Sequence, residues 1–88
     1  MQYLIDFTEQ ANEDIERHKK VGNKAILNKI FALMNELENH PTSGTGKPEP
    51  LKHKYKGCWS RRIDNEHRLI YKVEGGQIQI VKCRFHYD

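Results

Sequence analysis

The chain has little cysteine and no long apolar run. A membrane-spanning helix needs about 20 consecutive apolar residues, and the apolar runs here are only a handful of residues long. The N-terminal segment MQYLIDFTEQ lacks the basic and apolar regions of a signal peptide. Without an export signal, Cys58 and Cys83 are expected to be reduced thiols rather than a disulfide framework. We therefore expect a cytoplasmic protein that does not enter a membrane.

The 88 residues suit one small domain over residues 1–88, with no linker or internal repeat to divide it. A chain of this size buries a little over about 60% of its unfolded surface, which is enough for a modest core. The net charge of +3 is unevenly distributed. Residues 1–43 carry five Lys/Arg and seven Asp/Glu, whereas residues 44–88 carry ten and five. The basic second half suits either a polyanionic partner or an ordinary solvated strand face.

Two helices are expected in the first half, after a short strand at residues 2–7. Thr8 can cap a mostly polar helix over about residues 9–20, which Gly22 ends. Asn23 can cap a second helix, which His40-Pro41 ends. Apolar residues of this second helix recur at helical spacing and are expected to form one packed face: Ile26, Leu27, Ile30, Phe31, Met34 and Leu37.

The second half of the chain indicates strands, after the Gly- and Pro-rich loop TSGTGKPEP. A short strand is expected at residues 51–54, and longer ones at 58–64, 67–73 and 77–85. Gly75-Gly76 predicts a tight hairpin. A shift of apolar parity in the last strand predicts a bulge, or burial of both faces at its start. The order β-α-α-β-β-β predicts an α+β fold with two N-terminal helices packed on a mostly antiparallel sheet.

Polar residues of the opposite parity gather on the other face of this predicted sheet. The three long strands contribute cations and one histidine: Arg62, Arg68, Lys82, Arg84 and His86. The preceding loop carries Lys47, Glu49 and Lys52 directly into the sheet. One acid, several cations and a terminal His86-Tyr87 pair are therefore expected to converge.

Such a set suits cleavage of RNA by its own 2′-hydroxyl, which requires a base, an acid and a cation for the phosphorane charge. Glu and His can serve as base or acid, and Arg offers two parallel donors to phosphate oxygens. This chemistry requires no metal or cofactor, and the sequence has no HExxH motif or CxxC pair.

Each of these residues also has an ordinary structural explanation. Glu49, between two prolines, can be a surface charge, and Arg68 can be an ion-pair partner. His86 can be an exposed terminal residue, and Tyr87 can sit at the edge of the core or stack on an RNA base. From the residues alone, both explanations stay open.

Four motifs are more specific than this pattern: GKPEPL-K, WSRRI, EHRL-Y and C-R-HY. Over about residues 44–87 they resemble the YoeB/Txe group of the RelE/ParE toxin superfamily, whose members have microbial-RNase-like folds. The first half of the chain shares mainly the order of elements. The resemblance implies a bacterial toxin of a type II toxin–antitoxin system that cleaves mRNA in the ribosomal A site.

The resemblance also implies roles for individual residues. Glu49 is expected to act as the base, His86 as the acid and Arg68 as the ligand of the reacting phosphate. Tyr87 is implicated beside them. The expected contacts to the remaining RNA are Lys47, Lys52 and Arg62.

The implied partners are mRNA on the ribosome and a YefM- or Axe-like antitoxin that folds on binding. Such an antitoxin joins in repressing its own operon, so operator DNA is contacted only through it, and a homodimer fits the same likeness. Two departures from the family, Cys58 before the Trp and Asp88 after the His-Tyr pair, leave the expected catalytic set intact. The alternatives are a non-catalytic module that blocks the ribosome and a gyrase-poisoning toxin of the ParE branch, whose members lack this set.

Overall fold

A computed structural model describes residues 2–85 of the chain. The elements are β1 (Leu4–Phe7), α1 (Glu9–Lys20), α2 (Lys24–Leu37), β2 (Glu49–Pro50), the 3₁₀ turn η1 (His53–Tyr55), β3 (Cys58–Arg62), β4 (Arg68–Glu74) and β5 (Gln77–Lys82). The strands form one sheet in the order β1-β5-β4-β3-β2. Only the β1–β5 pair is parallel among the described strand pairs. The expected α+β fold, two helices on a mostly antiparallel sheet, is confirmed.

Both helices begin at the predicted caps. The Thr8 side chain accepts a hydrogen bond from the backbone N–H of Ala11, and the Asn23 side chain accepts one from Ile26. Each cap satisfies one of the N–H groups that a helix start leaves without a partner, which stabilises the helix by about 1 kcal/mol. The helix starts could be predicted because capping is local in sequence.

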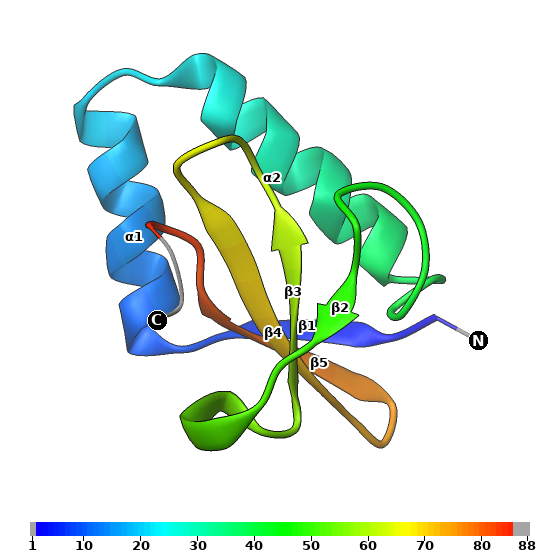
Figure 1. Ribbon diagram of the computed structural model, residues 1–88. Coiled ribbons are helices and arrows are strands. Elements are labelled where there is room, and N and C mark those ends of the chain that lie inside the picture. The colour runs from blue at the N-terminus through cyan, green and yellow to red at the C-terminus, as the bar shows by residue number, and fades with distance from the viewer. Residues whose placement is uncertain (1, 86–88) are drawn as a thin grey trace.

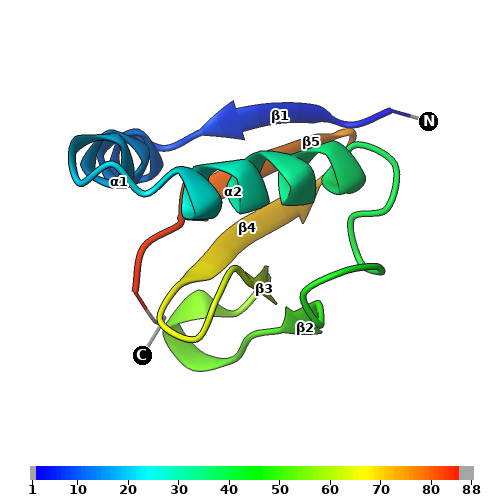
Figure 2. The ribbon, with the colours of Figure 1, turned by 90° about the horizontal axis from the view of Figure 1, so that it is seen from above.

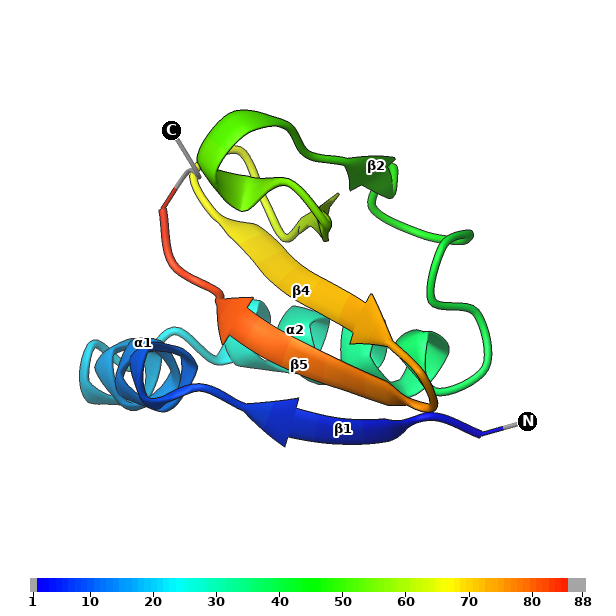
Figure 3. The ribbon, with the colours of Figure 1, turned by 90° about the horizontal axis from the view of Figure 1, so that it is seen from below.

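The two α-helices lie on one face of the sheet, and neither of them covers the opposite face. Figure 2 shows α2 in front of β4 and β5, and Figure 3 shows the opposite side, where these strands lie in front of α2. The core lies between the helices and the sheet, and its fully buried members include Ile30, Leu33, Tyr71 and Ile78. Each such aliphatic side chain stabilises the fold by about 1.5–3 kcal/mol relative to an exposed one.

One member of the expected helical face is misplaced. Phe31 is 46% exposed, whereas Leu33, which the prediction omitted, is fully buried. The residues of α2 that point into the core are Ile26, Ile30, Leu33 and Leu37. Their spacing of four, three and four residues follows one side of the helix, and Phe31 lies beside that stripe rather than within it.

The short strand expected at residues 51–54 is wrong. The strand is Glu49–Pro50, which pairs with β3, and the chain then turns through η1. His53 has a φ of 58° and Gly57 a φ of 94°. These left-handed conformations reverse the chain between β2 and β3 and are incompatible with an extended strand.

The bulge predicted in the last strand is present, although the strand is shorter than expected. Tyr71 pairs with Ile80 and Ile70 with Lys82, so Val81 is the extra residue in β5. The strand ends at Lys82 rather than Phe85. Beyond it, Phe85 has a φ of 61° and Arg84 stacks its guanidinium 4.3 Å from the Phe85 ring centre, so strand parity no longer places Arg84.

Candidate active site

The face of the sheet opposite the helices carries several charged residues, of which strand alternation predicted Arg62, Arg68 and Lys82. We call this surface the open face (Figure 3) and define it by side chains of opposite parity to the core: Glu49, Ser60, Arg62, Arg68, Ile70, Lys72 and Lys82. One row runs directly across four strands, from Glu49 through Ser60 and Ile70 to Lys82. Ser60 and Ile70 are buried, so only the charged ends of the row, Glu49 and Lys82, reach the surface. Because adjacent strands lie about 4.8 Å apart, the backbone of Glu49 lies about 10 Å from that of β4.

A second row of the open face holds two arginines. Arg62 of β3 pairs directly with Arg68 of β4. Like charges opposite one another on neighbouring strands destabilise a sheet by a few tenths of a kcal/mol. A pair of this kind beside a carboxylate suits a surface that binds an anion, because a bound phosphate offsets the repulsion.

The side chain of Arg68 is held in place by hydrogen bonds to the turn that precedes β4. Its Nη1 donates to the backbone oxygens of Asp64 at 2.9 Å and His67 at 3.1 Å. Asp64 itself closes the turn before β4, where its Oδ1 accepts from the N–H groups of Glu66 and His67. The guanidinium is therefore half-buried and oriented by a rigid turn rather than carried on a freely rotating side chain.

A groove of about 540 Å³ lies beside Glu49 and is lined by β2, η1 and the residues between them: Glu49, Pro50, Leu51, Lys52, His53, Lys54 and Tyr55. It includes the expected RNA ligand Lys52 and an amine–aromatic pair, with Lys54 Nζ 5.3 Å from the centre of the Tyr55 ring. Cations and an exposed aromatic edge suit a nucleic-acid strand. Tyr55 and His53 were not predicted as site residues, because part of this segment was expected to form a strand.

The loop that leads into β2 is fixed by a buried arginine on the helix side of the sheet. Arg61 is fully buried, and all five of its N–H groups have partners. Its acceptors are the Tyr71 hydroxyl, Glu36 Oε1 and the backbone oxygens of His40, Ser43 and Thr45. Hydrogen bonds from Thr45, together with the Arg61 guanidinium, lower the pKa of Glu36. The sequence predicts Arg61 only as one residue of an alternating strand.

Two glycines allow this loop to approach the sheet closely. A Cβ on Gly44 would lie 2.1 Å from Glu36 Oε1, and one on Gly46 would lie 2.9 Å from the Arg62 oxygen. Both have positive φ angles, 115° and 86°, which L side chains rarely adopt. The Gly46 oxygen accepts from the Arg62 N–H at 2.7 Å, which ties the loop to β3 just before Lys47 and Glu49.

The structure brings together most of the predicted site. Glu49, Arg62 and Arg68 share the open face, and Lys47 and Lys52 flank Glu49 in exposed positions. The predicted acid His86 and its neighbour Tyr87 lie outside the described residues. The chain reaches them from Phe85, whose backbone oxygen accepts from the Arg68 N–H at 3.0 Å.

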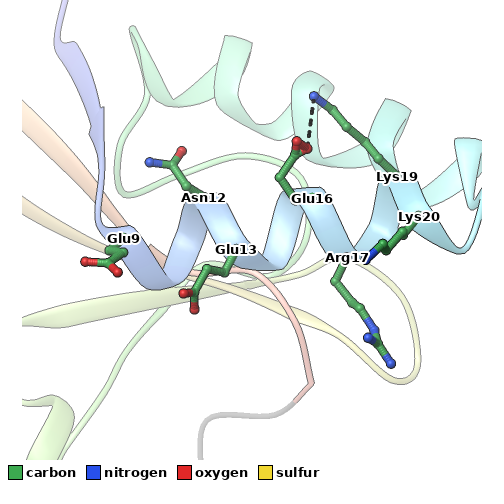
Figure 4. Close-up of a pocket in the computed structure, with 7 residues that line it drawn as sticks. All are labelled: Glu9, Asn12, Glu13, Glu16, Arg17, Lys19 and Lys20. Atoms are coloured by element: carbon green, nitrogen blue, oxygen red, sulfur yellow. Dashed lines mark ion pairs between the residues drawn. The ribbon is translucent and has the colours of Figure 1, made fainter.

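A hollow of about 810 Å³ elsewhere on the molecule has no such chemistry. Figure 4 shows that its lining residues all project from the outer side of α1: Glu9, Asn12, Glu13, Glu16, Arg17, Lys19 and Lys20. Its Lys19–Glu16 ion pair, 3.7 Å long, is exposed and contributes little to stability. Because all seven residues come from one helix, this hollow is a solvated helix surface rather than a site formed by several elements of the fold.

Within residues 2–85, no three His, Cys, Asp or Glu side chains are grouped so that they could hold a metal ion. The same residues contain no helix that is long and apolar enough to cross a membrane. Both cysteines are free, and burial raises the pKa of the Cys83 thiol to about 12. Cys83 is therefore a protonated, inert part of the core rather than a nucleophile.

Comparison with known proteins identifies a family that this chain resembles. A family model described as "YoeB-like toxin of bacterial type II toxin-antitoxin system" matches residues 7–87. Toxin YoeB of Escherichia coli K12 is 50% identical over 64 residues, covering 73% of this chain and 76% of the relative. Toxin YoeB of Synechocystis is 42% identical over 84 residues, covering 96% of both chains.

Solved structures give the same result. A YoeB/ParE toxin from Agrobacterium tumefaciens superposes with a TM-score of 0.90 at 37% identity, covering 96% of this chain and 99% of the other. YoeB of Staphylococcus aureus, solved in complex with YefM, gives a TM-score of 0.84 at 40% identity over 99% of this chain and 100% of the other. The same toxin has also been solved as a dimer, with a TM-score of 0.86.

Proposed function

Because the chain belongs to the YoeB family of type II toxins, we propose that it is a ribosome-dependent endoribonuclease that cuts mRNA in the A site. The observation that carries the proposal is the Arg62–Arg68 pair on the open face, beside Glu49 and within one sheet. A cationic surface with a carboxylate, on the side of the sheet away from the α-helices, matches what in-line cleavage of an RNA phosphodiester requires. We place this activity in the cytoplasm, where messages are translated.

In the proposed mechanism, the Glu49 carboxylate removes the proton from the 2′-hydroxyl, and the 2′ oxygen attacks the adjacent phosphorus. The Arg68 guanidinium, oriented by the Asp64 and His67 carbonyls, stabilises the negative charge that develops on the phosphorane oxygens. His86 protonates the departing 5′ oxygen, with Tyr87 beside it. The products are a 2′,3′-cyclic phosphate and a free 5′-hydroxyl.

Other cations hold the substrate in this mechanism. Arg62, next to Arg68, and Lys52, in the groove beside Glu49, bind flanking phosphates, and Lys47 lies at the entry to β2. None of these steps requires a metal. The base must be ionised while the acid is protonated, so the cleavage rate is expected to follow a bell-shaped pH profile.

We propose further that a YefM-like antitoxin neutralises this toxin and that two toxin chains can pair. YoeB of S. aureus is described both as a YoeB–YefM complex and as a dimer, and this chain shares its fold over nearly its whole length. Operator DNA is contacted through the antitoxin.

Replacing Arg68 by Lys is expected to lower the cleavage rate at saturating programmed ribosomes by about 10²–10³-fold. Lysine keeps the charge but cannot bind a phosphate through two parallel N–H groups, nor reach both carbonyls that orient Arg68. The measurement is single-turnover cleavage of a defined message, with Arg17→Lys on the outer surface of α1 as the matched control.

A variant that cuts as fast as the wild type would remove Arg68 from the reaction. If the wild type and the variant block translation equally strongly and both leave the message uncut, the result would instead favour a non-catalytic module that occludes the A site through its cationic face.

A further inference from the structure

Two buried histidines take no part in the mechanism above. His18 of α1 is 2% exposed and His67, just before β4, is 6% exposed. Their rings meet edge to face with centres 4.8 Å apart. Buried imidazoles need hydrogen-bond partners, because an unsatisfied polar group in a core costs about 1–3 kcal/mol. Each ring has a backbone partner in the same short segment of the chain.

That segment is residues 83–85, which follows β5 and leads to the predicted acid. At its start, the Cys83 N–H donates to Asp14 Oδ2 at 3.0 Å, and the Cys83 oxygen lies 3.0 Å from His18 Nε2. At its end, the Phe85 N–H donates to His67 Nδ1 at 2.7 Å. Figures 1 and 3 show this segment leaving β5 and passing to the side of the sheet where β4 begins. The side chains of Asp14, His18 and His67 therefore hold both ends of this segment, in addition to one backbone hydrogen bond from Arg68 to Phe85.

Phe85 is bound on both sides by two adjacent residues. Its N–H donates to His67 Nδ1, and its oxygen accepts from the Arg68 N–H. Arg68 is also the proposed phosphate ligand, and the residue after Phe85 is His86. The His67–Phe85 contact thus joins the piece of backbone that carries the acid to the piece that carries the cation.

The contact fixes the protonation state of His67. A backbone N–H can only donate, so Nδ1 must be an unprotonated acceptor, and the proton of the neutral ring must be on Nε2. Nε2 lies 3.4 Å from Glu66 Oε1. If Nδ1 gained a proton, two donors would face each other at 2.7 Å and the contact would be lost.

The groups around His67 shift its pKa in opposite directions. Burial lowers its pKa below the ordinary value of 6.5, and His18 and Arg84 act in the same direction. The Asp64 and Glu66 carboxylates oppose them. A lowered pKa keeps the ring neutral at neutral pH. The stability that the neutral ring contributes is complete above its unfolded pKa, near 6.5, and is lost as the pH falls through the lower, folded value.

We propose that His67 is a positioning residue for the C-terminal acid: its neutral imidazole holds the Phe85 backbone so that His86 is presented to the same phosphate as Arg68. The effect of His67 on catalysis rests on the proposed function, whereas the hydrogen bond between His67 and Phe85 can be tested separately. His67 touches neither the substrate nor the reacting atoms. Its protonation detaches Phe85 and adds a second ionisation to the acid limb of the cleavage profile.

The contact is tested by NMR on the intact wild-type protein. We expect the ¹⁵N shifts of His67 to show a bare Nδ1 and a protonated Nε2 at neutral pH. As the pH falls through the His67 pKa, the Phe85 amide should lose its protection from hydrogen exchange before the Cys83 amide, which is bound to the Asp14 carboxylate. A proton on Nδ1, or Phe85 protection that does not follow the His67 titration, would overturn the proposal.

The effect of the His67–Phe85 contact on catalysis is tested by single-turnover cleavage on programmed ribosomes. His67→Phe keeps an aromatic ring but removes the acceptor, and displacement of a catalytic group by about 1 Å can lower the rate about 10²-fold. The loss should appear in the rate at saturating ribosomes and not in ribosome affinity. His67→Asn places a non-titrating oxygen near the position of Nδ1, so it should retain more activity and lack the additional acid-limb ionisation. The control is His40→Phe, a change of an exposed side chain.

The outcomes separate the two proposals. If the wild type cuts and His67→Phe cuts equally fast with the same pH profile, the positioning role is wrong and the endonuclease stands. If the wild type cuts no message, the endonuclease is wrong, and the NMR titration still decides the contact. Should His67→Phe fail to fold, His67→Asn and the wild-type titration decide the question.

Discussion

Replacing Glu49 by Gln is expected to lower the rate of mRNA cleavage by about 10²–10⁴-fold, the usual contribution of a general base. The amide has nearly the same shape as the carboxylate but cannot take the proton of the 2′-hydroxyl. Glu49 stands at the end of the row that crosses β2, β3 and β4 and beside the groove of η1, so the substitution removes a reacting group without opening a cavity. Single-turnover cleavage of a defined message on programmed ribosomes measures the effect.

The matched control for this prediction is Glu13→Gln, which removes the same charge from the outer surface of α1 (Figure 4). It is expected to cut at the wild-type rate. If Glu49→Gln cuts as fast as Glu13→Gln, Glu49 is not the base, and the role would have to pass to another group on the open face.

Replacing Arg61 by Met is expected to lower the free energy of unfolding by about 3 kcal/mol. The change leaves Glu36 and three backbone oxygens of residues 40–45 without the guanidinium that joins them to β3. The effect should lie at the lower end of the range for a broken buried pair, because Glu36 is partly exposed and water can replace some of these contacts. Such a loss is a large part of the roughly 5–15 kcal/mol that stabilises a small domain.

The neighbouring residue provides the control for Arg61. Arg62→Met also removes a guanidinium from β3, but from an exposed position opposite Arg68. This substitution should change the free energy of unfolding, measured with urea, by no more than about 0.5 kcal/mol. A change in the stabilising direction would follow from removal of the like-charge pair. Equal losses for the two variants would show that the network around Arg61 does not hold the loop.

Sequence predicted those parts of the fold that local patterns determine. The helix starts, the Gly75-Gly76 hairpin and the bulge at Val81 each depend on residues within a few positions of one another. Strand parity also placed Arg62 and Arg68 on one face, because alternation holds whatever the strand pairs with. Glu49 was expected in the preceding loop, and the structure shows it in β2 on the same face.

The rest depends on contacts between distant residues. Asp14 and His18 belong to the mostly polar helix α1, yet both are buried, and their partner Cys83 lies more than 60 residues later in the chain. Arg61 and Arg62 are the same residue type in the same strand, yet one is fully buried and the other exposed. Parity assigned each to a face, but charge alone gave no reason to expect a buried guanidinium with five partners.

The proposed function also assigns a chemical role to His86, which the family resemblance supplied. Cleavage mapping of one defined mRNA on programmed ribosomes, with the wild type and His86→Gln compared side by side, tests the central claim most directly. The account predicts a cut inside the A-site codon by the wild type and its loss in the variant. An uncut message with translation still blocked by the wild type would contradict the endonuclease, and an equal cut by both proteins would contradict the role of His86.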